Sequence, residues 1–154
     1  MAGNTDPVYS KVGDIQSTTL AAATLLGPTA NTAQDGTGTL YPIFTADATN
    51  GGYVQKLTFQ PITSTALTVC RIFISDTVPT VTSGALVSNT SLNTRLLNEI
   101  LLPAVTVSQT AAAPHLELPI NMALPPGYRL SVTFGTSTGA STTGWAINAI
   151  AGKY

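Results

Sequence analysis

The only histidine of the chain, His115, is the one side chain whose usual pKa lies near neutral pH. Glu117 follows two residues later, so in an extended strand the two side chains share a face and can form a surface ion pair. Catalysis by a histidine also needs a nucleophile and a group that orients the imidazole ring. A lone histidine specifies neither, so a polar strand position is the favoured interpretation of His115. We expect no catalytic residues and no enzymatic activity.

Ligands for a metal ion are also few. A zinc site needs several histidines or cysteines, and this chain has one of each, His115 and Cys70, far apart in sequence. The five aspartates fall in expected loops or near the N-terminus: Asp6, Asp14, Asp35, Asp47 and Asp76. None has the closely spaced acidic pattern of a calcium loop, which favours turn-forming roles. The glycine-rich segments lack a phosphate-binding lysine, so we expect neither a metal nor an organic cofactor.

Sugar binding on a β-sheet often uses exposed aromatic side chains, and here the candidates are Trp145 and five tyrosines. Trp145 shares a strand face with Ile147 and Ala149, so we expect it in the core. Four tyrosines have no such assignment: Tyr9, Tyr41, Tyr53 and Tyr154. They suit a protein interface at least as well as a glycan site.

The composition of the chain is poor in charge. Only 8% of the 154 residues are charged, about a third of the usual share, whereas threonine alone contributes 26 residues. The formal net charge of −1 and the absence of basic runs leave nothing to neutralise nucleic-acid phosphates. A free soluble protein normally carries more charge, so we expect partner molecules to cover much of the surface.

The hydrophobic runs are too short to cross a membrane. The longest spans residues 20–23 and extends past Thr24 to Leu26, whereas a membrane helix needs about 20 apolar residues. Early acidic residues and the lack of a hydrophobic stretch after the first residue argue against a signal peptide. The single Cys70 excludes an internal disulfide, and we expect it to act as a small buried hydrophobic residue.

Threonine, branched aliphatic and aromatic residues dominate segments that glycine, proline and asparagine separate about every ten residues, a pattern typical of a β-sandwich or barrel. The seven expected strands are residues 40–46, 53–60, 66–75, 92–102, 115–122, 128–134 and 144–151. Residues 92–102 also have a helical composition, but Pro103 and the β-like neighbouring segments favour a strand. An eighth strand is possible near Leu86 or Val105.

Residues 115–122 and 128–134 show the clearest alternation of apolar and polar side chains. The apolar positions are Leu116, Leu118, Ile120 and Met122 in the first segment, and Tyr128, Leu130, Val132 and Phe134 in the second. Residues 123–127 join them and end in Pro-Pro-Gly. This pattern predicts a hairpin with Met122 opposite Tyr128 and Leu116 opposite Phe134.

Residues 66–75 are apolar on both faces apart from Arg71. Leu67, Val69 and Phe73 lie on one face, and Cys70, Ile72 and Ile74 lie on the other. A sandwich buries only one face of each sheet, so a second layer is expected outside this strand, either a neighbouring subunit or the N-terminal segment. Because the composition changes near residue 38, we expect an extended N-terminal arm, residues 1–38, and one β-sandwich domain, residues 39–154.

Four segments of the C-terminal part carry a resemblance to a known class: residues 118–121 (Leu-Pro-Ile-Asn), 123–130 (Ala-Leu-Pro-Pro-Gly-Tyr-Arg-Leu), 144–147 (Gly-Trp-Ala-Ile) and 151–154 (Ala-Gly-Lys-Tyr). Together with the threonine-rich middle of the chain, they resemble the ends of small structural proteins of tailed bacteriophages. The resemblance implies an antiparallel, jelly-roll-like β-sandwich of about seven or eight strands. It also implies a head decoration or cement protein on the capsid surface of the virion, which forms a homotrimer and binds the major capsid protein.

Such a protein stabilises the phage head by bridging neighbouring capsid subunits, because many copies each bury apolar surface. The expected contact residues are Asn4, Asp6, Val8 and Tyr9 in the arm, and Cys70, Ile72 and Ile74 on the outer face of residues 66–75. Similar domains occur in tails, baseplates and fibres, so the alternative is a binding module for a host receptor or glycan. Neither interpretation involves nucleic acid or a membrane.

Overall fold

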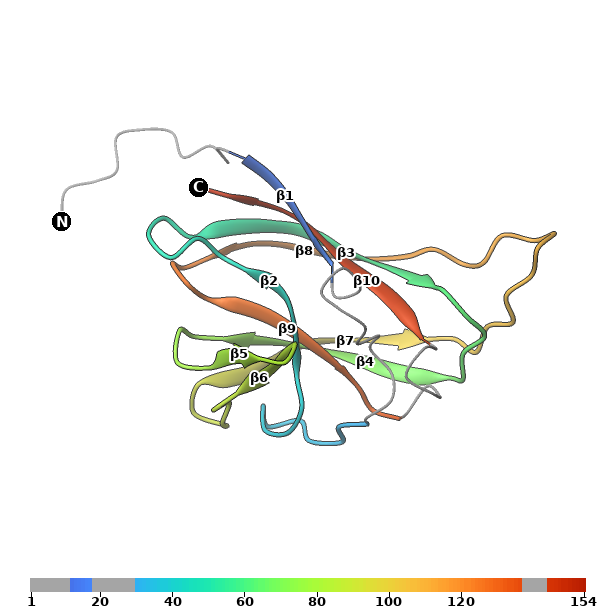
Figure 1. Ribbon diagram of the computed structural model, residues 1–154, viewed down its shortest axis with the longest axis horizontal. Helices are drawn as coiled ribbons and strands as arrows, with labels where there is room; N and C mark the ends of the chain where they lie inside the picture. The colour runs from blue at the N-terminus through green and yellow to red at the C-terminus, as the bar shows by residue number, and fades with distance from the viewer. Residues whose placement is uncertain (1–11, 18–29, 137–143) are drawn as a thin grey trace.

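The computed structural model describes residues 30–136 and 144–154, and the backbone of residues 12–17. These parts form two four-stranded antiparallel sheets and a small hairpin, and none of them is helical (Figure 1). The strands are β1 (Val12–Ser17), β2 (Tyr41–Thr45), β3 (Gly52–Pro61), β4 (Thr68–Ser75), β5 (Thr80–Thr82), β6 (Ala85–Val87), β7 (Thr94–Leu102), β8 (Leu116–Leu124), β9 (Arg129–Phe134) and β10 (Trp145–Lys153). The antiparallel β-sandwich expected from the sequence is confirmed, and all seven expected strands are present.

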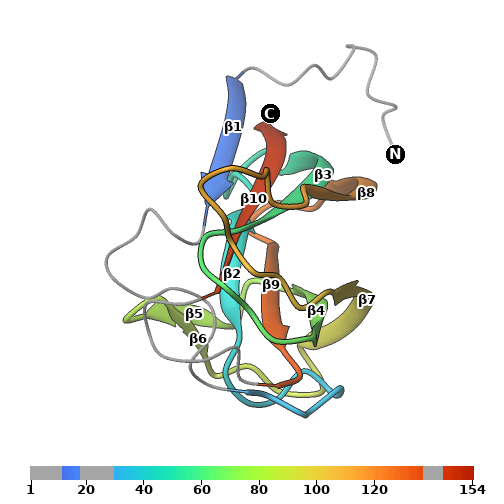
Figure 2. The ribbon, with the colours of Figure 1, turned by 90° about the vertical axis from the view of Figure 1, so that its right-hand side faces the viewer.

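The two large sheets use the strands in an interleaved order. Sheet A runs β1-β10-β3-β8, and sheet B runs β2-β9-β4-β7. Successive strands alternate between the sheets except at β4 and β7, which are neighbours in sheet B and are separated in sequence by the β5–β6 hairpin. Figure 2 shows the sheets as two layers, with the edge strands β7 and β8 on the same side. Each sheet therefore contains strands from both halves of the chain.

The core lies between the sheets and is built from alternate residues of the central strands. In sheet A, Leu57 and Phe59 of β3 and Trp145 and Ile147 of β10 have no exposed surface. Leu130 of β9 is equally buried and packs into the same cluster from sheet B. The period of two along each strand places these side chains inward and their neighbours outward. Trp145 thus occupies the core, as the sequence predicted.

The predicted hairpin of residues 115–122 and 128–134 is wrong. β8 pairs with β3 in sheet A, whereas β9 pairs with β2 and β4 in sheet B. The linker between them crosses from one sheet to the other, and Gly127 in it has a φ of 73° and donates its backbone N–H to the Asp47 carbonyl. The apolar faces of β8 and β9 exist as expected, but they face each other from opposite sheets across the core. Alternation identifies the buried face of a strand and leaves its pairing partner open.

One strand lies within the segment expected to be an arm. β1 pairs with β10 from Val12 opposite Lys153 to Ser17 opposite Asn148, and it forms one edge of sheet A. Farther along, the backbone N–H of Asn31 donates to the Phe134 carbonyl at 2.9 Å. The boundary at residue 38 therefore does not separate an arm from the sandwich. Residues 12–17 form a strand because β10 offers them a row of backbone hydrogen-bonding groups.

The two faces of β4 are reversed relative to the expectation. Cys70 and Ile72 are fully buried in the core, and Ile74 packs against the core. Burial raises the pKa of the Cys70 thiol far above its usual range, so this side chain is a neutral hydrophobic group. Arg71 explains the orientation, because turning its face inward would place a guanidinium between the sheets. Cys70 and Ile72 are therefore core residues and do not lie on an outer contact face.

The outer face of β4 has a second layer, as expected, and in the described residues the chain itself provides it. Phe73 points outward yet is fully buried in a small cluster with Leu40 and Leu86. Leu86 belongs to β6, and its backbone N–H donates to the Leu40 carbonyl at 2.8 Å. The β5–β6 hairpin therefore covers part of the outer face of sheet B, while Val69 and Arg71 on the same face of β4 stay partly exposed.

Candidate functional site

An apolar edge runs along β7, the outermost strand of sheet B. Its residues Leu96, Leu97 and Leu101 are 36%, 38% and 61% exposed. Leu67 is 58% exposed and lies beside the end of β7, since Thr68 pairs with Leu102. We call these four residues, Leu67, Leu96, Leu97 and Leu101, the leucine edge. Exposed large apolar side chains along one edge are typical of interaction surfaces, so the leucine edge is a candidate site.

A shallow pocket of about 260 Å³ lies at one end of the leucine edge, on the outer face of sheet B. Leu67, Val69 and Leu101 form its apolar walls, and Val69 and Leu101 are direct cross-strand partners. Arg71 and Thr136 add polar groups to the lining. The pocket can therefore accept an apolar side chain of a partner while its polar groups bond to the partner's backbone.

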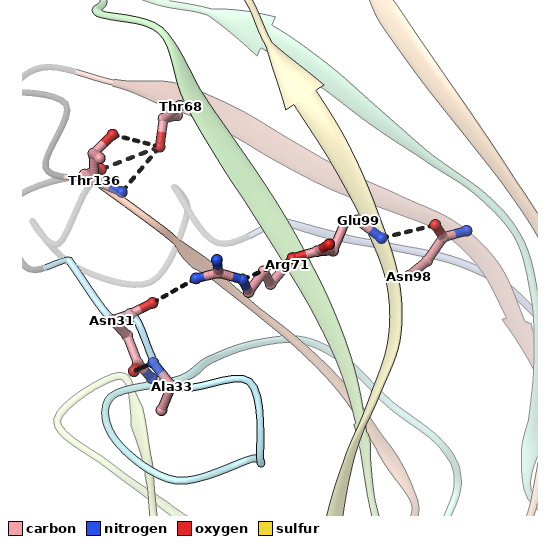
Figure 3. A network of polar contacts seen from close by, with 7 residues as sticks. All are labelled: Asn31, Ala33, Thr68, Arg71, Asn98, Glu99 and Thr136. Carbon is pink, nitrogen blue, oxygen red and sulfur yellow. Dashed lines mark hydrogen bonds and ion pairs between the residues drawn. The ribbon is translucent and has the colours of Figure 1, made fainter.

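The hydrogen bonds of Arg71 connect the segments that surround this pocket (Figure 3). Its Nε donates to Glu99 Oε1 at 2.8 Å across the β4–β7 pair, and its Nη1 donates to the Asn31 carbonyl at 3.0 Å. Also in the pocket lining, the Thr136 hydroxyl donates to Thr68 Oγ1 at 2.9 Å, which joins the segment after β9 to β4. These bonds hold the polar part of the pocket in one conformation before any partner arrives.

The backbone of β7 is protected against the addition of another strand. The register with β4 shifts between Ile72 and Phe73, so Leu97 has no partner residue opposite it. One residue farther along, Asn98 Oδ1 accepts the backbone N–H of Glu99 at 2.7 Å. Bulges and local side-chain caps are common devices that prevent edge-to-edge pairing of sheets. We therefore expect a partner to contact the leucine side chains and not to extend the sheet.

The contact residues expected from the sequence are distributed differently in the structure. Asn4, Asp6, Val8 and Tyr9 lie outside the described residues. Cys70 and Ile72 are in the core, and Ile74 lines a small pocket of about 190 Å³ next to Tyr128. Sequence reasoning missed the leucine edge, although three of its leucines lie in residues 92–102 and Leu67 lies in residues 66–75. Their exposure follows from the position of β7 at the end of the sheet, which the local pattern does not reveal.

The predicted surface pair of His115 and Glu117 forms part of a polar cluster on the outer face of sheet A. His115 Nε2 lies 3.5 Å from Glu117 Oε1, and His115 Nδ1 lies 3.2 Å from Gln60 Oε1. Lys56 Nζ donates to the same Glu117 oxygen at 2.6 Å. All these groups face solvent, and no three His, Cys, Asp or Glu side chains in the described ranges are arranged to hold a metal. The cluster is a surface ion-pair network.

The pKa of Glu117 is lowered mainly by the hydrogen bond from Lys56, with a smaller contribution from His115. Because folding lowers this pKa, the stabilisation is present above the unfolded-state pKa and is lost as the pH falls through the folded-state value. We expect a carbon-detected NMR titration of the Glu117 carboxyl to show a midpoint below the usual glutamate range. Lys56→Gln should move that midpoint upward, whereas Lys153→Gln should leave it in place. A wild-type midpoint at or above the usual range would contradict the ion pair.

A serine motif lies just after β9. Residues 135–139 read Gly-Thr-Ser-Thr-Gly, which has the Gly-x-Ser-x-Gly spacing of a hydrolase nucleophile elbow. The elbow requires a strand followed by a helix, but residues 137–143 lie outside the described part and Gly144 leads directly into β10. The backbone N–H of Gly135 donates to Val69 in sheet B, whereas His115 contacts Gln60 of sheet A.

No protein-family model, curated protein or solved structure matches this chain. Among the described residues, no helix is long and apolar enough to cross a membrane.

Proposed function

We propose that this chain is a non-enzymatic structural subunit of a bacteriophage virion, a decoration or cement protein that attaches to the outer capsid surface. The leucine edge is the observation that carries the proposal, because four large apolar side chains project at one edge of a domain with little charge. Burying such surface against a neighbour is favourable by about 25 cal/mol per Å². The assignment to a capsid comes from the resemblance of the C-terminal segments to phage structural proteins.

The strand order supports this proposal. We interpret the sandwich as a jelly roll, because eight strands are arranged as β1-β10-β3-β8 against β2-β9-β4-β7, which matches the double Greek-key order of that fold. Jelly rolls occur in viral capsid domains and also in lectins. The fold is therefore compatible with a virion component, and the apolar edge is what favours assembly over other roles.

The proposed mechanism is mechanical. Each copy places its leucine edge against the major capsid protein or a second copy of itself, and the segment that contains Asn4, Asp6, Val8 and Tyr9 adds a second contact. A homotrimer presents three such edges, so the whole ring dissociates only when all contacts open together. Bridging between neighbouring capsid subunits then resists the internal pressure of the packed head. The low net charge suits this role, because little charge must be desolvated on attachment.

The test uses the double variant Leu67→Ser/Leu101→Ser of the full chain. The probe is empty shells of the phage that encodes the protein, stripped of this protein, and binding is measured by co-sedimentation. Each buried leucine contributes at least about 1.5 kcal/mol, so we expect binding to weaken by about a hundredfold or more. Leu92→Ser is the matched control, because Leu92 is 86% exposed but precedes β7 at the opposite end of the strand. Far-ultraviolet circular dichroism checks that all variants keep the fold.

Two results would contradict the proposal: a wild-type chain that neither forms oligomers nor binds shells, and a double variant that binds as well as the control. The contribution of the arm is measured separately by deleting residues 1–11. This deletion keeps β1, whereas a deletion through residue 17 would remove an edge strand of sheet A and expose β10. Attachment that survives the shorter deletion would assign the contact to the leucine edge alone.

A further inference from the structure

We infer that the outer face of sheet A carries a binding site for a neutral saccharide, at a pocket remote from the leucine edge. The pocket has a volume of about 230 Å³ and is lined by Tyr53, Gln55, Asn121, Ile150, Ala151 and Gly152. These residues come from β3, β8 and β10, three adjacent strands of sheet A. This inference does not depend on the assembly proposal.

The pocket lies where the registers of β3 with both of its neighbours shift at the same place, between Val54 and Lys56. On one side Ile150 pairs with Lys56 and Ala151 with Val54, so Gln55 is passed over in the register with β10. On the other side the register with β8 also shifts between Val54 and Lys56. Here β8 carries the extra residue, because Ile120 and Asn121 both lie between the partners of Val54 and Lys56. Two adjacent bulges, one on β3 and one on β8, break the flat surface of the sheet and redirect side chains, as bulges beside binding sites do.

Asn121 adds backbone strain at this place. Its φ is 47°, in the left-handed region that non-glycine residues rarely adopt. The other described non-glycine residues with positive φ are Ser83 and Ser88, which lie at the turn between β5 and β6 and just after β6. Asn121 lies inside a nine-residue strand. Strain of this kind persists where the surroundings hold it, and it is common at ligand sites.

The chemistry of the lining favours an uncharged ligand with several hydroxyl groups. None of the six described lining residues is charged, so a phosphate or a carboxylate would find no counter-charge in them. The exposed amides of Gln55 and Asn121 each offer an acceptor oxygen and an NH₂ donor, which suits hydroxyls that both donate and accept. The Tyr53 hydroxyl donates to Asn121 Oδ1 at 3.3 Å, which orients the NH₂ group of that amide for a ligand.

Apolar surface completes the match to a sugar ring. The side chain of Ile150 and the ring of Tyr53 are half-buried and line the same pocket as the two amides. A pyranose has an apolar C–H face and hydroxyls around its rim, so it can contact both kinds of group at once. The pocket is smaller than a typical drug-sized site, which fits one sugar unit bound with a Kd on the order of 1 mM.

The experiment is a ¹H–¹⁵N NMR titration of the full chain with glucose, galactose, mannose and N-acetylglucosamine, each up to about 50 mM, well above the expected Kd. At least one sugar should cause saturable shifts of the backbone amides of Tyr53, Gln55 and Gly152 and of the side-chain NH₂ of Asn121. Glycerol at the same concentration controls for a general effect of polyols. N-Acetylneuraminic acid tests whether a charged sugar is excluded.

Three variants test the contribution of the pocket residues to sugar binding. Asn121→Gly keeps the positive φ without strain and removes the amide, so it should fold normally and weaken binding at least tenfold. Gln55→Ala should also weaken binding, whereas Gln60→Ala, on the same strand beside His115, should not. The inference is overturned if none of the four sugars shifts these signals, if glycerol shifts them equally, or if Asn121→Gly binds as wild type. None of these outcomes depends on whether the chain attaches to a capsid.

Discussion

Trp145→Ala should lower the free energy of unfolding by about 3–5 kcal/mol. Trp145 is the first residue of β10, pairs with Pro61 of β3 and has no exposed surface. It is the largest side chain of the core, so its removal leaves a cavity that the surrounding strands can close only in part. For a chain of this length the loss corresponds to a fall in Tm of about 6–20 °C. Thermal and urea denaturation followed by circular dichroism measure it without the tryptophan signal.

Trp145→Phe is the matched control for this prediction. It keeps an aromatic ring in the same place and removes an indole N–H that has no hydrogen-bond partner among the described residues. A buried donor without a partner is itself costly, so its loss offsets part of the lost packing. We expect the phenylalanine variant to be clearly more stable than the alanine variant. A Trp145→Ala protein whose Tm lies within about 2 °C of wild type would show that Trp145 is not part of the core.

Ile72→Ala should lower the free energy of unfolding by about 2–5 kcal/mol, because Ile72 lies at the centre of the sandwich. It is fully buried on β4, between Asn98 of β7 and Val132 of β9. The truncation removes three carbon atoms from the main core cluster and leaves the outer surface of the sheet unchanged. Urea denaturation measures the effect, and shell binding of the folded fraction should stay as in wild type.

Leu101→Ala is the counterpart on the outer surface of the same sheet. Leu101 is 61% exposed, so its truncation should change the free energy of unfolding by less than about 0.5 kcal/mol and should act on attachment instead. The pair therefore separates a core role from an interface role. If Ile72→Ala left stability unchanged and reduced shell binding, the original expectation that Ile72 faces a partner would be correct and the orientation of β4 would be wrong.

Only part of each candidate site could be expected from the sequence. The surface pair of His115 and Glu117 was expected because two residues at a spacing of two share a strand face. The adjacent bulges at Gln55 of β3 and at Asn121 of β8, and the positive φ of Asn121, were not predicted from the sequence, since neither residue is a glycine. Bulges result from the registers of three strands together, so no single segment encodes them.

Local patterns were sufficient to determine the all-β class, the approximate limits of seven strands and the burial of Trp145. Each of these depends on residue type and on a period of two along one segment. The tertiary structure alone decided that β8 and β9 belong to different sheets, that residues 12–17 form an edge strand and that the face of β4 with Arg71 points outward. These choices depend on which distant strand lies alongside and on where a charge can meet its partner, as Arg71 meets Glu99. Because most strands pair with segments far away in the chain, the location of the leucine edge is a property of the assembled sheets.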